Sequence, residues 1–135
     1  MSELKPAPEG AGTESSGLLL SRDLFFTSKI TGTARELGYR VLVAGTLPLA
    51  STMIEQGRPR VVFVDLAAGD LVSIPALIAY RKLAPAETTF LAFGSHVDTQ
   101  ALAGARSAGC DPVLPRSKFS AELPDLIRRY FGSGG

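Results

Sequence analysis

Short apolar segments alternate with longer segments of helical periodicity along most of the chain. Five segments predict β-strands, at residues 17–21, 40–44, 60–65, 89–93 and 112–114. The third and fourth are almost continuously apolar, which is typical of strands buried on both faces of a parallel sheet. We therefore expect a sheet that is covered by helices on both sides.

Helical spacing of apolar residues fills the intervals between these strands, with capping residues at several of the ends. Five helices are predicted: one that contains Phe26, Ile30 and Leu37 and stops at Gly38, one from about 48 to 56 between Thr46 and Gly57, one capped by Asp70, one from Asp98 or Thr99 to Gly109, and one from about 120 to 131. Pro124 fits the last helix only in its first turn, since proline has no N–H to donate.

The strand–helix alternation occurs five times and implies right-handed crossovers. The predicted fold class is α/β, a flavodoxin-like (βα)5 three-layer sandwich whose parallel sheet has the strand order 2-1-3-4-5. In such a fold, ligands bind outside the carboxyl ends of strands 1, 3 and 4. Functional residues are therefore expected at those strand ends.

The two ends of the chain differ from the rest. Residues 1–16 are polar, rich in Pro, Gly and Ser, and without periodicity, and they predict a disordered tail because they have little surface to bury. Residues 132–135 predict a flexible C-terminal stub. We expect the folded domain to cover residues 17–131.

Composition excludes several classes of function. Fourteen Lys and Arg residues against 13 Asp and Glu give a net charge of +1, which does not favour binding to nucleic acid or to an anionic membrane. No apolar run is long enough to span a membrane, and no signal peptide is recognisable. A single cysteine, Cys110, and a single histidine, His96, exclude a disulfide framework and a Cys- or His-cluster metal site. We expect a cytoplasmic protein.

Three features stand at fixed spacings around the third predicted strand. Gly38-Tyr39 closes the first helix, Asp65 follows the apolar run 61–64, and residues 108–111 (Ala-Gly-Cys-Asp) precede the fifth strand. In these features residues 17–131 resemble the receiver domain of bacterial response regulators. The resemblance implies that Asp65 stands at the position of the phosphate-accepting aspartate.

The positions around Asp65 depart from the pattern of the family. Ser21 and Arg22 stand where the resemblance places two metal-binding acids, and the acidic Asp23 comes one residue later. Magnesium prefers oxygen ligands, chiefly carboxylates, phosphate and water. Arg22 removes one such ligand and adds a fixed cation, so we expect weak Mg²⁺ binding at most and no other cofactor. Asp23 is expected to cap the first helix.

Two further positions also differ. Gly94, followed by Ser95, stands where the family ends strand 4 with Thr or Ser, and Arg116 stands where the family has a lysine. A guanidinium offers paired N–H donors to a carboxylate. We therefore expect Arg22 or Arg116 to lie beside Asp65, with Arg22 favoured because strands 1 and 3 are neighbours.

The favoured interpretation is a pseudo-receiver, a non-catalytic signalling or adaptor domain that acts through protein contacts. In receivers the face formed by helix 4, strand 5 and helix 5 often docks partners or forms homodimers, which suggests Leu102, Arg106, Phe119 and Tyr130 as contact residues. Two alternatives stay open. One is a phosphoryl-accepting receiver that uses Asp65 in a two-component phosphorelay, and the other is a small-ligand binder or enzyme on the same fold.

Overall fold

The computed structural model describes residues 16–132, which contain a five-stranded parallel sheet in the order β2-β1-β3-β4-β5. The strands are β1 (Ser16–Leu20), β2 (Arg40–Ala44), β3 (Val61–Asp65), β4 (Thr89–Gly94) and β5 (Val113–Pro115). The predicted fold class and strand order are confirmed. Ser16 belongs to β1, and the remainder of the expected tail and stub, residues 1–15 and 133–135, lies outside the described residues.

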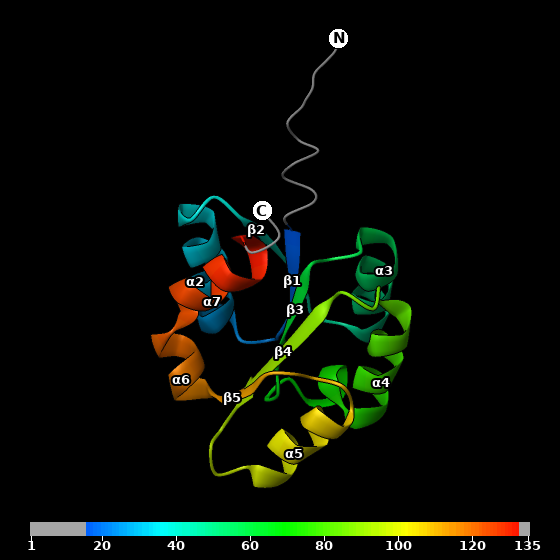
Figure 1. Ribbon diagram of the computed structural model, residues 1–135. Helices are drawn as coiled ribbons and strands as arrows, with labels where there is room; N and C mark the ends of the chain where they lie inside the picture. Colours follow the sequence, from blue (N-terminus) through cyan, green and yellow to red (C-terminus); the bar gives the residue numbers. More distant parts are fainter. Residues whose placement is uncertain (1–15, 133–135) are drawn as a thin grey trace.

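Helices cover both faces of the sheet (Figure 1). One face carries α2 (Leu24–Glu36), α6 (Arg116–Ala121), α7 (Leu123–Ile127) and a final π-helical turn, η2 (Arg128–Gly132). The other face carries α3 (Leu47–Gly57), the 3₁₀ turn η1 (Gly69–Val72), α4 (Ile74–Leu83) and α5 (Thr99–Ser107). No helix among residues 16–132 has the length and apolarity that crossing a membrane requires.

Alternate side chains of the central strands enter two hydrophobic cores, one on each face. Val62 and Val64 of β3 pack into the core under α3, α4 and α5. Phe63 of the same strand enters the second core, under α2, α6 and α7. There Phe119 lies stacked on Phe93, with ring centroids 4.1 Å apart. Burial on both faces explains why the sequence of β3 is apolar throughout.

The two ends of the described fold meet at the amino-terminal edge of the sheet. Phe131 of η2 lies against β1, and a Cβ atom built on Gly17 would lie only 2.6 Å from its Cζ. The Phe131 ring also stacks on Tyr39, with ring centroids 5.0 Å apart. Glycine at position 17 therefore lets the last turn of the chain close over the first strand.

Three predicted helix caps are confirmed, and one is wrong. Asp23, Thr46 and Asp98 accept hydrogen bonds from backbone N–H groups in the first turns of α2, α3 and α5. Asp70, in contrast, lies within η1, and the cap of α4 is Ser73, whose side chain accepts from the backbone N–H of Ala76. Pro75 lies in the first turn of α4, where its missing N–H removes no hydrogen bond within the helix.

Two predicted helix ends also differ from the structure. Gly57 is the last residue of α3, and the left-handed position falls on Arg58 (φ 45°), directly before Pro59. The last predicted helix begins at Arg116, four residues early, and is divided into α6 and α7 at Glu122. Pro124 explains the division, since it cannot donate to a carbonyl group of the preceding turn.

Candidate functional site

Asp65 ends β3 and lies at the carboxyl edge of the sheet, with only 2% of its surface exposed. Ser21, which follows the neighbouring strand β1, donates a hydrogen bond from Oγ to Asp65 Oδ2 (2.8 Å). The backbone N–H of Ala67 donates to Asp65 Oδ1 (3.0 Å). Two neighbouring loops therefore hold this buried carboxylate in one orientation.

Arg116 supplies the third donor to the carboxylate. Its Nη2 donates to Asp65 Oδ1 (3.1 Å), and its guanidinium lies over the Phe26 ring at 5.7 Å from the centroid. The expectation that an arginine lies beside Asp65 is confirmed for Arg116, at the start of α6, and is wrong for Arg22. The cation counterbalances the charge of the buried carboxylate.

Arg22 instead joins three loops at this edge. Its Nε donates to the carbonyl oxygen of Gly45 in the β2–α3 loop (3.0 Å), and its Nη1 donates to Asp70 Oδ1 in η1 (2.8 Å). This hydrogen bond, together with the charge of the guanidinium, lowers the pKa of the exposed Asp70 carboxyl group below its ordinary value of 3.8. The sequence argument for Arg22 failed because the long side chain reaches away from Asp65, across the edge of the sheet.

Replacing Arg22 by alanine is expected to return the pKa of Asp70 toward 3.8 and to loosen the three loops. Since the folded-state pKa of Asp70 is lowered, this contact stabilises the fold above the ordinary pKa and is lost as the pH falls through the lowered value. An NMR titration of the Asp70 carboxyl carbon measures the shift. Equal pKa values in the two proteins would show that Arg22 does not act on Asp70.

The receiver resemblance implies a magnesium ion at this edge, but the residues present do not fit one. The carboxylate of Asp23 accepts from the backbone N–H of Phe26 as the cap of α2, and that of Asp70 pairs with Arg22. Asp65 accepts three protein hydrogen bonds. Residues 16–132 contain no group of three His, Cys, Asp or Glu side chains that is suited to a metal ion.

Gly94, at the end of β4, adjoins a side chain that the sequence analysis did not single out. A Cβ atom on Gly94 would lie 3.1 Å from both Cβ and Cδ1 of Leu66. Leu66 thus occupies the space beside Gly94 into which the hydroxyl residue of the family pattern would project. Its position directly after the buried Asp65 is the only signal in the sequence, and that signal does not give the direction of the side chain.

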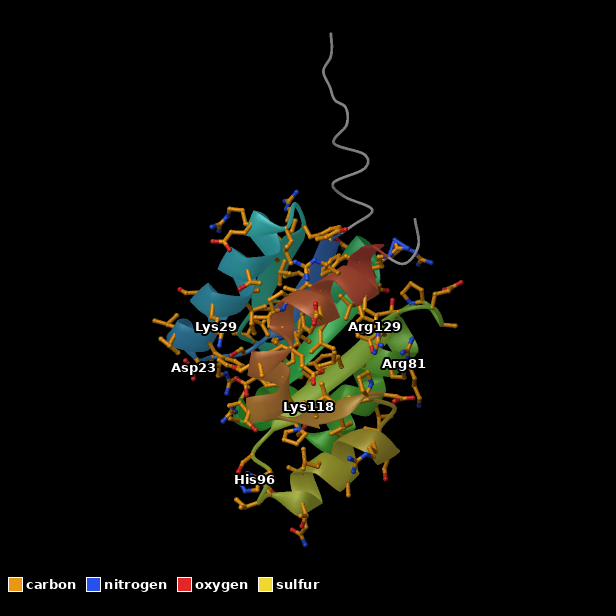
Figure 2. The ribbon with its side chains drawn as sticks, turned by 60° about the vertical axis from the view of Figure 1, so that its left-hand side comes forward. Asp23, Lys29, Arg81, His96, Lys118 and Arg129 are labelled. Atoms are coloured by element: carbon orange, nitrogen blue, oxygen red, sulfur yellow. The ribbon has the colours of Figure 1, made fainter. Side chains whose placement is uncertain are left out.

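The β4–α5 loop contributes a shallow hollow next to Arg116. Ser95, His96, Arg116 and Ser117 line this hollow, whose volume is about 350 Å³. His96 is exposed, and Figure 2 shows it at the margin of the molecule, in the loop before α5. The Ser95 hydroxyl accepts from the backbone N–H of Val97 (3.4 Å). The structure therefore brings two of the predicted site residues, Ser95 and Arg116, to the same part of the edge.

The predicted partner residues are for the most part not available for contact. Phe119 is fully buried in the second core, and Leu102 of α5 is buried in the first core. Tyr130 is half-buried, and only Arg106 is exposed. Because Phe119 is a core residue with 0% of its surface exposed, its expected role in partner contact is not supported.

Large apolar side chains are exposed near the Asp65 edge instead. Leu24 and Phe25 in the first turn of α2 are 82% and 79% exposed, and Val97 in the β4–α5 loop is 73% exposed. All three residues follow carboxyl ends of strands, β1 for Leu24 and Phe25 and β4 for Val97, and so lie at the same edge of the sheet as Asp65. They were not identified from sequence, because an apolar pair at the start of a helix is equally typical of core packing.

Two titratable groups in the first core have raised pKa values because they are buried. Burial raises the pKa of the Cys110 thiol to about 11, so this cysteine is protonated at neutral pH and unreactive. Burial also raises the pKa of Tyr80 to about 12, and its hydroxyl donates to the carbonyl oxygen of Leu71 (2.7 Å). Both residues serve packing.

Comparison of the sequence finds no matching family model and no matching curated protein. Comparison of the structure finds many solved chains. A CheY-like receiver domain protein from Methanospirillum hungatei JF-1 is 17% identical, with a TM-score of 0.74, and the match covers 87% of this chain and 94% of that one. The receiver domain of a sensor histidine kinase from Pseudomonas aeruginosa PAO1, solved with magnesium in its active-site cleft, is 21% identical, with a TM-score of 0.73 and coverage of 87% and 97%.

A third similar structure has a different description. A putative pilus assembly-related protein from Burkholderia pseudomallei K96243 is 21% identical, with a TM-score of 0.69, and the match covers 90% of this chain and 92% of that one. At these identities the likeness is one of fold. The chain therefore has the CheY-like flavodoxin fold that receiver domains of two-component systems adopt.

Proposed function

We propose that this chain is a receiver-like signalling domain of the pseudo-receiver type, which acts through protein contacts without accepting a phosphoryl group. The observation that carries the proposal is the state of Asp65. Both of its carboxylate oxygens accept hydrogen bonds from protein donors, and a fixed guanidinium stands beside them. A cytoplasmic location and protein partners are part of this proposal.

Phosphoryl transfer to a carboxylate depends on positioning and on cations that neutralise the charge of the transferred group. In receivers Mg²⁺ supplies much of that charge. Here Arg22 and Ser21 replace the acids that would hold the metal, and Asp23 is engaged as a helix cap. Leu66 fills the space beside Gly94, where the family pattern has a hydroxyl side chain. These features all disfavour phosphorylation of Asp65.

The contact surface that we propose is the apolar group formed by Leu24, Phe25 and Val97. The side chains are exposed, and they come from the first turn of α2 and from the β4–α5 loop, which both follow carboxyl ends of strands. A homodimer through α5, β5 and α6 has less support, since Phe119 is committed to the core. The likeness to a pilus assembly-related protein agrees with a role in protein assembly.

Incubation with acetyl phosphate and millimolar Mg²⁺ is expected to leave the protein unmodified, because the side chains beside Asp65 do not form a magnesium site. Intact mass spectrometry detects the mass of one phosphoryl group. The Pseudomonas receiver domain, which holds magnesium in its cleft, is the positive control for the reagent. An Asp65→Asn variant is the matched control within this chain.

Phosphorylation of the natural protein that is lost in Asp65→Asn would overturn the pseudo-receiver proposal. It would establish the second candidate function, a phosphoryl-accepting receiver. That candidate has a specific observation in its favour, since Arg116 stands at the position of the family's lysine and contacts Asp65. One structural neighbour, a response regulator from Burkholderia pseudomallei, is described with a phosphorylated aspartic acid.

A further inference from the structure

A second hollow lies at the amino-terminal edge of the sheet, at the opposite end of the strands from Asp65. Its volume is about 290 Å³. The α3–β3 loop contributes Arg58 and Arg60, the α4–β4 loop and the start of β4 contribute Glu87 and Thr89, and η2 contributes Tyr130. Three segments that are distant in sequence thus meet around one concave surface. The contacts around Asp65 do not account for this surface.

The walls of this hollow are held by buried hydrogen bonds. Thr88 Oγ1 donates to the carbonyl oxygen of Pro59 (2.7 Å), and the Thr89 N–H donates to that of Arg60 (3.1 Å). Arg81 of α4 holds the α4–β4 loop in place. Its Nη1 donates to the carbonyl oxygen of Thr88 (2.7 Å), and its guanidinium lies 4.7 Å from the centroid of the Phe90 ring. Figure 2 shows Arg81 at this end of the molecule, away from Asp23 and His96. The hollow is therefore preformed.

Arg58 has a backbone conformation that favours glycine. Its φ of 45° lies in the left-handed region, which is unfavourable for residues with a Cβ atom, and Pro59 restricts it further. Glycine, which would relieve this strain, stands one position earlier, at Gly57. Strained residues of this kind tend to occur at functional sites, where their side chains are needed. The strain points to a role for the Arg58 guanidinium.

The polar groups of the hollow define the chemistry of a ligand. Arg58 and Arg60 contribute two positive charges and Glu87 one negative charge, and no acid among residues 16–132 lies within ion-pair distance of either arginine. Guanidinium groups bind phosphate through paired N–H donors, and Tyr130 carries a further hydroxyl donor. The carboxylate of Glu87 is an acceptor that suits a ligand hydroxyl group.

We propose that this hollow binds a small organic phosphate that also carries a hydroxyl group, with the phosphate on Arg58 and Arg60 and the hydroxyl on Glu87. The volume is at the small end of the range for ligand pockets, which fits a compact molecule. The site is independent of Asp65, and it holds whether or not Asp65 accepts a phosphoryl group.

The test is a ¹⁵N NMR titration of the full chain without Mg²⁺. Glycerol 3-phosphate is expected to shift the amide signals of Arg60 and Thr89 in a saturable way, at millimolar concentration. Inorganic phosphate is expected to shift the same signals with weaker affinity, and glycerol is expected to leave them unchanged. Unmoved signals at tens of millimolar glycerol 3-phosphate would overturn the proposal.

Two variants separate this site from general attraction of anions. Arg60→Gln is expected to weaken glycerol 3-phosphate binding about tenfold or more, since a charge-assisted contact is lost. Arg58→Gly is expected to weaken binding similarly and to raise the melting temperature, because it relieves the strained backbone. Arg106→Gln, at an exposed arginine of α5, is the matched control and is expected to bind normally. Equal weakening in all three variants would contradict a built site.

Discussion

Replacing Phe119 by alanine is expected to lower the free energy of unfolding by about 3–5 kcal/mol, the range for large-to-small changes at fully buried aromatic positions. Phe119 is completely buried and stacks on Phe93. It also lies 5.8 Å from the Phe63 ring and 5.9 Å from the Phe26 ring, measured between centroids. Its removal leaves a cavity among three aromatic rings and weakens the packing of α6 on the sheet. Urea unfolding followed by circular dichroism measures the loss.

The matched control is Leu24→Ala, at a large apolar residue that is 82% exposed. Its effect on the free energy of unfolding is expected to stay within about 0.5 kcal/mol. If Phe119→Ala cost no more than this control, the second core would not depend on Phe119, and a role of Phe119 in partner contact would have to be reconsidered. The comparison therefore tests whether α6 belongs to the core or to an interface.

Replacing Arg116 by methionine is expected to lower the free energy of unfolding by about 1–3 kcal/mol, because the buried carboxylate of Asp65 loses its counter-charge. The loss is smaller than for a fully buried pair, since the Arg116 side chain is 40% exposed and water reaches it. Ser21 and Ala67 continue to donate to Asp65. Methionine retains much of the apolar contact with the Phe26 ring, so the loss of stability measures the contribution of the positive charge of Arg116.

A double-mutant cycle isolates the interaction between the two side chains. Asp65→Asn removes the charge of the carboxyl group, and the Arg116→Met change is then expected to cost about 1 kcal/mol less than in the natural protein. Arg116→Lys, which keeps the charge, is expected to retain part of the stability. Additive losses in the cycle would show that Arg116 and Asp65 do not interact in solution.

The sequence predicted the sheet well because the strand patterns are clear and the connections are short. The nearly continuous apolar run of β3 indicated a central strand. The regular alternation of strands and helices then favoured the strand order 2-1-3-4-5. The last helix was misplaced for a physical reason. A proline is tolerated in a first turn, and Pro124 occupies the first turn of α7, but the same residue also separates that helix from α6, which begins at Arg116.

The site was predictable in position and less so in its contacts. Asp65 follows from the apolar strand that it ends, and Ser21 follows from the neighbouring strand. The choice between Arg22 and Arg116 depended on side-chain direction, which strand order does not determine. Leu66 and the backbone N–H of Ala67 were missed because neither residue type suggests chemistry. Only the three-dimensional arrangement shows that the Ala67 N–H donates to the carboxylate and that the Leu66 side chain fills the space beside Gly94.

The closure of Phe131 over Gly17 has a practical consequence for how the molecule can be held. Both ends of the described fold leave from the amino-terminal edge, while Asp65 lies at the other end of β3, roughly 15 Å away at the usual rise per residue of a strand. A surface linkage or fused reporter at either end would therefore orient Asp65, Leu24 and Val97 outward. Protein that is immobilised in this way leaves the proposed contact surface accessible to a partner in a surface-binding measurement.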